Sequence, residues 1–300
     1  MRLFLKFIDF SLIWTLFFPQ TSRKVAKSSQ RSPVPHTPTS HPTPKAPHTT
    51  MRYHLLDALR GFALVNMIAY HTLWDVVQTV PQTIPQTSAG ALTPALLFTP
   101  AIHTWQQAIG FTFIFLAGFC FPLGRRPLFR GVELIALGEV ISLVTFLAIP
   151  DEPVRFGVLT LIGFGMLVLA LVHAWTRTLH PAWMALLGVL SLAVFVVFHD
   201  VQSGGAPSWL YANSFTALLG FPPAGFVSSD YYPLVPHVFV MLAGLCAYRC
   251  SSSFLPIFSH HAPTPLGRGL EWMGRHSLAI YLGHQVIIYA VVMGVAQLLA

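Results

Sequence analysis

Long apolar runs, each followed by a polar connection, recur along most of this chain. The hydrocarbon core of a membrane is about 30 Å thick, and a helix needs about 20 apolar residues to cross it. Trp and Tyr stand near several ends of the runs, where their amphipathic rings favour the membrane surface. The pattern predicts an all-α fold, a polytopic transmembrane helical bundle with about seven spanning helices. The runs are residues 55–77, 107–123, 131–149, 156–175, 182–199, 233–249 and 277–299.

The composition supports a membrane protein and argues against other classes. Of the 300 residues, 54% are hydrophobic and 9% are charged, whereas an average soluble domain has roughly 25% charged residues. A large soluble α/β enzyme is excluded because the runs are too long for strands and the connections are too short to hold helical layers. The net charge of +7 would suggest a nucleic acid only if it formed one patch. We therefore expect the lipid bilayer, and no nucleic acid, as a partner.

Arginine is distributed unevenly between the two sides of the predicted bundle. One side has only Arg155, and its two long loops, residues 78–104 and 200–232, contain no Lys or Arg. Cytoplasmic loops carry an excess of Lys and Arg. The Arg-rich side, with the residues just before the first helix, is therefore predicted to be cytoplasmic, and the C-terminus to lie outside. That side holds Arg52, Arg60, Arg125, Arg126, Arg130, Arg177, Arg249, Arg268 and Arg275.

Residues 1–50 differ from the rest of the chain. Residues 3–18 are apolar but short, and Lys6 and Asp9 interrupt them. The tract that follows is rich in Pro, Ser, Thr and His, a composition that cannot bury a core. We expect residues 1–50 to be a disordered extension, or one that a mis-assigned start has added before Met51, and residues 51–300 to form the transmembrane domain.

The first apolar run carries ionisable residues on one helix face. Asp57, Arg60, His71 and Asp75 follow helical spacing. The rise from Arg60 to His71 is roughly 16 Å, which places Arg60 near the cytoplasmic interface and His71 beyond the middle of the bilayer. Asp75 could orient the ring of His71, and Asp57 could pair with Arg60. Because ionisable groups are costly at membrane depth, a functional role is favoured over an interfacial Arg and a hydrogen-bonding His.

These residues lead to a family resemblance. An Arg and a His separated by ten residues, Arg60 and His71, are similar to the signature of the transmembrane acyltransferases, including acyltransferase family 3. Over about residues 51–299 the chain also resembles bacterial membrane proteins related to the catalytic domain of heparan-α-glucosaminide N-acetyltransferase. The segments that carry this resemblance are LDALRGFALVNMIAYH, FTFIFLAGF, RFGVLTLIGFGML, SDYYPLVPHVFVMLAG and GRHSLAIYLGHQ.

The resemblance implies a transmembrane acyltransferase of the bacterial inner membrane. It would move an acyl group, expected to be acetyl, from cytoplasmic acetyl-CoA to the nitrogen or oxygen of an extracytoplasmic sugar or glycan, with no metal and no haem. The catalytic His of the animal enzyme lies in the loop before the second helix, where this chain has His103. His71 or His103 would deprotonate the acceptor or carry the acyl group transiently. The choice between them stays open.

Arginines are the candidates for holding the donor. Arg125, Arg126 and Arg130 form a cluster in a short cytoplasmic connection. Together with Arg60 they could clamp the phosphates of acyl-CoA, for which the forked guanidinium is suited. A simple topology anchor is the structural alternative. For Glu139, in the middle of a predicted helix, we favour a structural pair with a basic group such as Arg60.

Candidates for binding the acceptor lie in the later helices. Asp230 stands at the outer mouth of the sixth run, where it could bind an acceptor hydroxyl or amine, or cap that helix. His237 lies within the sixth run, and His284 and Gln285 lie within the seventh. Each of these could line a cavity or form a hydrogen bond between helices.

Two other functions explain parts of the pattern. Intramembrane Arg, His, Asp and Glu also suit a proton-coupled small-molecule transporter, although no repeat relates the two halves of the chain. A haem protein would need two His pairs at matched depth, and the ordered acyltransferase segments would go unexplained. Cys246 and Cys250 lack the second pair that a zinc site requires. The oligomeric state stays open, with a homodimer as one option.

Overall fold

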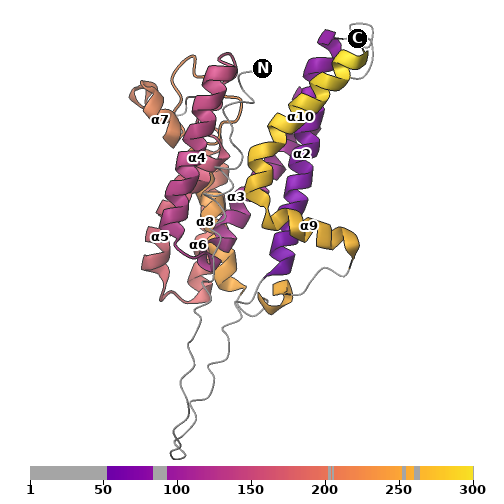
Figure 1. The fold of residues 1–300 in the computed structure, drawn as a ribbon. Coiled ribbons are helices and arrows are strands. Elements are labelled where there is room, and N and C mark those ends of the chain that lie inside the picture. The colour runs from indigo at the N-terminus through magenta and orange to yellow at the C-terminus, as the bar shows by residue number, and fades with distance from the viewer. Residues whose placement is uncertain are drawn as a thin grey trace, which may run out of the picture. The chain divides into compact units, whose positions relative to one another are not determined.

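A computed structural model describes residues 53–83, 93–201, 204, 206–251, 255–259 and 264–299 (Figure 1). All the regular structure in these ranges is helical, and seven of the helices coincide with the seven predicted runs. The predicted all-α polytopic bundle is thereby confirmed, whereas the predictions for residues 1–50 fall outside the described residues. The seven helices are α2 (His54–Thr83), α3 (Pro100–Cys120), α4 (Pro127–Ala148), α5 (Val158–Thr176), α6 (Pro181–Phe198), α8 (Leu234–Cys250) and α10 (Ser277–Leu299).

Most of these helices are long and apolar enough to cross a membrane. Within the described ranges five meet that condition, namely α3 with the turn that follows it, α4, α5, α6 and α10. The apolar helix α8 is shorter, with 17 residues. α2 has 30 residues, and Asp57, Arg60 and Asp75 lower its hydropathy. The chain is thus an integral membrane protein that carries ionisable groups in its first described helix.

Two features of the fold differ from the predicted runs. α3 begins at Pro100, because Thr99 is extended and a proline suits the first turn of a helix. The polar pair Gln106 and Gln107 made the run appear to start later. The short helix α9 (Pro265–Arg275) was not predicted at all. Its polar and apolar residues alternate at helical spacing, so it contains no long apolar run.

A central group of helices forms the main core. α8 packs against α3, α5 and α6, and α4 packs against α5. Ile114, Leu161 and Met241 are fully buried where α3, α5 and α8 meet. Gly118 faces the Met241 carbonyl and Gly244 faces the Phe115 carbonyl, so α3 and α8 cross with their backbones in contact. In contrast, α4 and α6 leave most of their apolar side chains exposed, as expected for helices that face lipid.

α2 packs between the last two helices of the chain. Figure 1 shows α10 lying along α2 and α9 crossing its lower end. The crossing is close because Gly61 faces the Leu270 carbonyl and Gly274 faces the Asp57 carbonyl. A side chain at either glycine would collide with backbone atoms. The first and last spanning helices are therefore neighbours, although about two hundred residues separate them.

Candidate functional site

Two imidazoles meet in the interior between α2 and α10. The ring centroids of His71 and His284 are 5.0 Å apart, with an angle of 60° between the ring planes. One turn further along α2, both carboxylate oxygens of Asp75 accept hydrogen bonds from Nε2 of Gln285, at 3.1 and 3.2 Å. We call His71, Asp75, His284 and Gln285 the interior cluster. The structure thus brings together two pairs of residues that the sequence analysis had placed on different helices, with no contact expected between the pairs.

Two acceptor atoms of the interior cluster are buried without a partner. Nδ1 of His284 contacts the Tyr281 carbonyl at 2.6 Å, so its other ring nitrogen, Nε2, points away from the helix backbone. Nε2 of His284 and Oε1 of Gln285 are both buried and have no hydrogen-bond partner in the described part of the chain. Buried polar atoms are rarely left in this state. Nε2 of His284, whose ring lies next to that of His71, and Oε1 of Gln285 are therefore available to accept a hydrogen bond from a ligand.

Asp75 does not contact His71 as the sequence predicted. The prediction rested on the four-residue spacing, which places both side chains on one face of α2. In the structure the carboxylate turns to Gln285 on α10 instead. A hydrogen bond between helices satisfies the carboxylate and leaves the His71 ring free of hydrogen bonds to described residues. The expected Asp75–His71 contact is therefore wrong, and Asp75 ties α2 to α10.

Aromatic side chains surround the interior cluster. The ring of Tyr70 contacts those of His71 and Trp105 edge to face, at 5.6 and 5.7 Å between centroids. Tyr232 packs over Gly110, where any larger residue would meet its hydroxyl. Tyr281 lies within electrostatic range of Tyr232 and Asp230. Aromatic side chains of α2, α3 and α10 therefore lie around the two imidazoles, and Tyr70 and Tyr281 carry hydroxyl groups.

His237 and His103 lie apart from the two imidazoles. His237 is buried, its Nδ1 contacts the Pro233 carbonyl at 2.9 Å, and its ring packs against Tyr232 and two phenylalanines. His103 lies in the first turn of α3 with an exposed side chain. It forms no hydrogen bond through its ring with any described residue. Among the described residues, a second imidazole lies against the ring of His71, whereas none lies against that of His103.

Asp230 caps a helix, but a different one from the helix predicted. Its Oδ2 accepts a hydrogen bond from the Val158 backbone N–H at 3.4 Å, at the first turn of α5. Gly157 permits this approach, because a Cβ there would lie 2.8 Å from Oδ2. Residues 152–156 and 228–232 run side by side and hold the carboxylate in place through backbone hydrogen bonds such as Tyr232 N–H to the Phe156 carbonyl at 3.0 Å. Burial raises the pKa of Asp230 to about 6, opposed in part by the Val158 N–H.

A second site lies at the other end of α2. A cleft of about 240 Å³ is lined by Arg60, Arg130 and Asp57, and we call it the basic cleft. Nη1 of Arg60 lies 3.3 Å from Oδ1 of Asp57, which confirms the pair that the spacing predicted. The remaining lining residues are Tyr53, Leu56, Cys120, Leu123 and Gly124.

The arginine cluster predicted from residues 125–130 is divided in the structure. Arg130 lines the basic cleft, whereas Arg125 is exposed outside it. Arg126 has a left-handed backbone (φ 55°) and lines a separate, mostly apolar cleft of about 430 Å³ with Phe129 and His173. The turn at Arg126 sends consecutive side chains in different directions. Only Arg130 of the three shares a cleft with Arg60.

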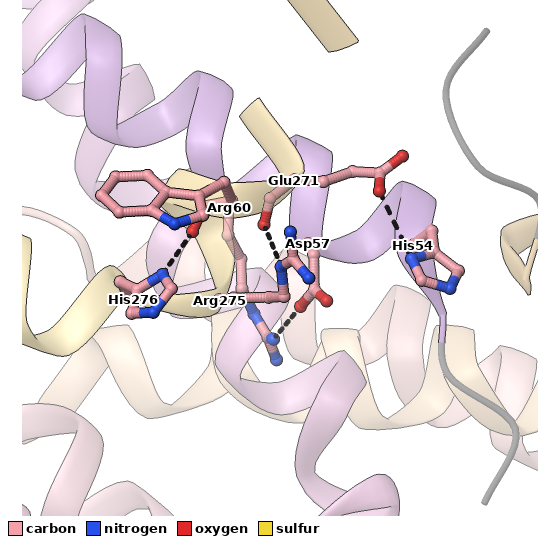
Figure 2. A network of polar contacts seen from close by, with 7 residues as sticks. His54, Asp57, Arg60, Glu271, Arg275 and His276 are labelled. Carbon is pink, nitrogen blue, oxygen red and sulfur yellow. Dashed lines mark hydrogen bonds and ion pairs between the residues drawn. The ribbon is translucent and has the colours of Figure 1, made fainter. Parts of the chain in front are cut away.

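α9 places a further polar network beside the basic cleft (Figure 2). Nδ1 of His54 lies 3.3 Å from Oε2 of Glu271, whose side chain is 2% exposed. Nε of Arg275 donates to the Glu271 carbonyl at 3.3 Å, which keeps Arg275 over the same helix turn. Glu271 was not among the predicted site residues, although Thr264 followed by Pro265 is a typical start signal for a helix.

Glu139 does not form the pair that was predicted for it. It lies on the exposed face of α4, while Arg60 pairs with Asp57. The prediction of a structural pair with Arg60 is therefore wrong. Within the described ranges, no three His, Cys, Asp or Glu side chains are grouped so that they could hold a metal ion.

One comparison with known proteins identifies a family for this chain. The family model described as heparan-alpha-glucosaminide N-acetyltransferase, catalytic, matches residues 52–286. That range contains the interior cluster and the basic cleft. No curated protein and no solved structure matches the chain.

Proposed function

Because this chain belongs to the heparan-alpha-glucosaminide N-acetyltransferase catalytic family, we propose that it transfers an acetyl group from cytoplasmic acetyl-CoA to an extracytoplasmic sugar or glycan. The observation that carries this proposal is the arrangement along α2. Arg60 lines the basic cleft at one end, and His71 meets a second imidazole further along the same helix. The rise between them is about 16 Å, a distance that the extended pantetheine arm of CoA can span.

The donor binds with its phosphates at the basic cleft. Arg60 and Arg130 supply two guanidinium groups there, and charge-assisted, forked hydrogen bonds suit phosphate oxygens. Asp57 holds Arg60 at the wall of the cleft, so the guanidinium is in position before the donor arrives. Arg125 and Arg126 lie nearby on the connection before α4 and add positive charge at the same end. The thioester then points along α2 toward the interior cluster.

His71 is the general base of this proposal. It takes the proton from the acceptor hydroxyl or amine as the acceptor's oxygen or nitrogen attacks the carbonyl carbon of the thioester. The new C–O or C–N bond forms, the C–S bond breaks, and the CoA thiolate leaves and receives a proton. The absence of a hydrogen bond on the His71 ring within the described chain supports this role. His103, exposed in the first turn of α3, is the alternative base.

The acceptor enters from the end of the bundle where Asp230 lies. One oxygen of Asp230 caps α5, and the other accepts no hydrogen bond from described residues, which leaves it for an acceptor hydroxyl or amine. The aromatic wall of Tyr70, Tyr232 and Trp105 provides faces on which a sugar ring can stack. His237, whose ring packs against Tyr232, and Gln285 of the interior cluster supply further hydrogen-bonding groups.

The proposal is tested with the full chain purified into lipid nanodiscs. Binding of acetyl-CoA is measured by calorimetry, and release of the free CoA thiol is followed after glucosamine is added as a probe acceptor. We expect acetyl-CoA to bind and thiol release to depend on the acceptor. Absence of acetyl-CoA binding would contradict the proposal, and proton-driven solute uptake in liposomes without thiol release would favour a transporter instead. Mass spectrometry of envelope glycans, with and without the gene, then identifies the acceptor.

A further inference from the structure

The protonation pattern of His284 follows from its contacts. Its Nδ1 lies 2.6 Å from the Tyr281 carbonyl oxygen. A carbonyl oxygen can only accept a hydrogen bond, so the hydrogen of the neutral ring must be on Nδ1. Nε2 then carries a lone pair and can only accept. This nitrogen is buried and has no partner in the described ranges, and the side chain as a whole is 8% exposed.

His71 is the group placed to supply the missing proton. Its ring is the imidazole next to His284, with centroids 5.0 Å apart. At that separation a nitrogen of each ring can approach to hydrogen-bonding distance, about 2.7–3.2 Å, after a rotation of the His71 side chain. No hydrogen bond to a described residue opposes that rotation. Two imidazolium rings this close in a buried site would repel each other, so the pair holds one added proton at a time.

The other titratable groups around the pair leave it as a separate unit. On α2, Asp75 is engaged by Gln285, and Tyr70 contacts the edge of the His71 ring. On α10, Tyr281 offers its carbonyl to His284 and its ring lies 5.6 Å from it. Asp230 and Tyr232, before α8, lie within electrostatic range of Tyr281. None of these groups forms a hydrogen bond with Nε2 of His284.

We propose that His71 and His284 form a proton relay, a role that rests on the acetyltransferase function proposed above. His71 takes the acceptor's proton on one ring nitrogen and passes the proton of its other nitrogen to Nε2 of His284. His284 becomes the imidazolium, and its Nδ1–H, still bonded to the Tyr281 carbonyl, stabilises the positive charge. When the C–S bond breaks, the proton returns through His71 to the CoA thiolate, and both rings end neutral. His284 acts through His71 and is a positioning residue.

The shared proton can be tested without any activity. The full chain is labelled with ¹⁵N-histidine in nanodiscs, and His71→Asn and His284→Asn variants assign the two signals. We expect His284 to show Nδ1 protonated and Nε2 unprotonated at neutral pH. As the pH is lowered, the signals of both rings should report the uptake of one proton, and the curve of His284 should change in His71→Asn. Independent titration of the two rings, or a hydrogen on Nε2, would overturn the relay.

A kinetic measurement then tests the role in turnover. His284→Asn keeps a donor for the Tyr281 carbonyl but has no atom at the Nε2 position. We expect kcat to fall about 10-fold or more, with KM for acetyl-CoA unchanged, and the rate in mixtures of H₂O and D₂O to change from a curved to a linear dependence on deuterium content. His276→Asn removes an imidazole with the same kind of Nδ1 contact, to the Trp272 carbonyl at 2.8 Å, and we expect it to keep the curved dependence. Unchanged kcat and an unchanged curve in His284→Asn would overturn the relay. Coupled titration without any thiol release would instead contradict the acetyltransferase function.

Discussion

The imidazole of His71 is the side chain on which the proposed chemistry depends most directly. We predict that His71→Ala lowers acetyl transfer by about two orders of magnitude or more, because general-base catalysis typically contributes 10²–10⁴-fold. Binding of acetyl-CoA should be retained, since the basic cleft lies at the other end of α2. Thiol release and calorimetry measure the two quantities. His103→Ala is the comparison, and near-normal turnover of His71→Ala together with loss in His103→Ala would move the base to α3.

The affinity for acetyl-CoA tests the proposed roles of Arg60 and Arg130. We predict that the Arg60→Gln and Arg130→Gln variants each weaken acetyl-CoA binding, by about 1.5–3 kcal/mol for each charged hydrogen bond that is lost. Binding should also weaken with rising salt, because exposed charges are screened. Arg177→Gln removes the same charge from an exposed position outside the basic cleft and is the control. Equal effects of the three variants would indicate a general effect of charge and contradict a phosphate site.

Asp230 gives a prediction for pH dependence. Its folded pKa of about 6 lies above the ordinary value of 3.8. A carboxyl whose pKa is raised by folding stabilises the folded state fully below its unfolded pKa, and this contribution is lost as the pH rises through the folded pKa. The melting temperature should therefore fall between about pH 4 and pH 6, and Asp230→Asn should flatten that interval. Circular dichroism measures both proteins, and identical curves would contradict the buried carboxyl.

Local spacing predicted some side-chain contacts and could not predict others. The pair of Asp57 and Arg60 follows from a three-residue spacing on one helix, and the structure has it. The contact of His71 with His284 joins residues 213 positions apart (284 − 71 = 213). Spacing along α2 suggested Asp75 as the partner of His71, because the position of α10 could not be read from the run. His71 and His284 were both predicted as candidate site residues, but their contact with each other could be seen only in the folded structure.

Among the elements, α9 provides the clearest test of packing. We predict that Gly274→Ala destabilises the protein by about 1–3 kcal/mol, because an added methyl group would collide with the Asp57 carbonyl of α2. Gly269→Ala on the same helix meets no atom and is the control; removing a helix glycine there should be neutral or slightly stabilising. Thermal unfolding followed by tryptophan fluorescence measures both. Equal melting temperatures would show that α9 does not pack on α2 in this way.

Apolar runs predict elements well when the element is long and uniformly apolar. α4, α5, α6, α8 and α10 therefore lie close to their predicted bounds. No apolar run marks α9, because its eleven residues mix charged and apolar positions. The run that predicted α3 begins later than the helix, because two glutamines precede the apolar part of α3. Capping signals, Thr264–Pro265 for α9 and Thr99–Pro100 for α3, mark these starts better than hydropathy does.

On the scale of the whole molecule, the arginine positions predict the orientation in the membrane. Arg60 and Arg130 line one cleft, and Arg249 donates a hydrogen bond to the Arg177 carbonyl at 3.0 Å, so the arginines within each of these two pairs lie close together. In a variant without the native cysteines, Ala224→Cys should react with a membrane-impermeant reagent in intact cells, and Leu128→Cys should not. The reverse pattern would contradict the orientation and the direction of transfer.

The packing of α2 against α10 also governs the order in which the protein can be assembled. During synthesis α2 enters the membrane before α10, carrying His71 and Asp75, whereas Gln285 and His284 arrive with α10. Until then the carboxylate of Asp75 has no amide to bind, and a helix with unsatisfied charges is held weakly in lipid. A ribosome that stalls before α10 leaves a nascent chain with spanning segments but no paired imidazoles. The proposed proton relay can therefore operate only after α10 has been inserted beside α2.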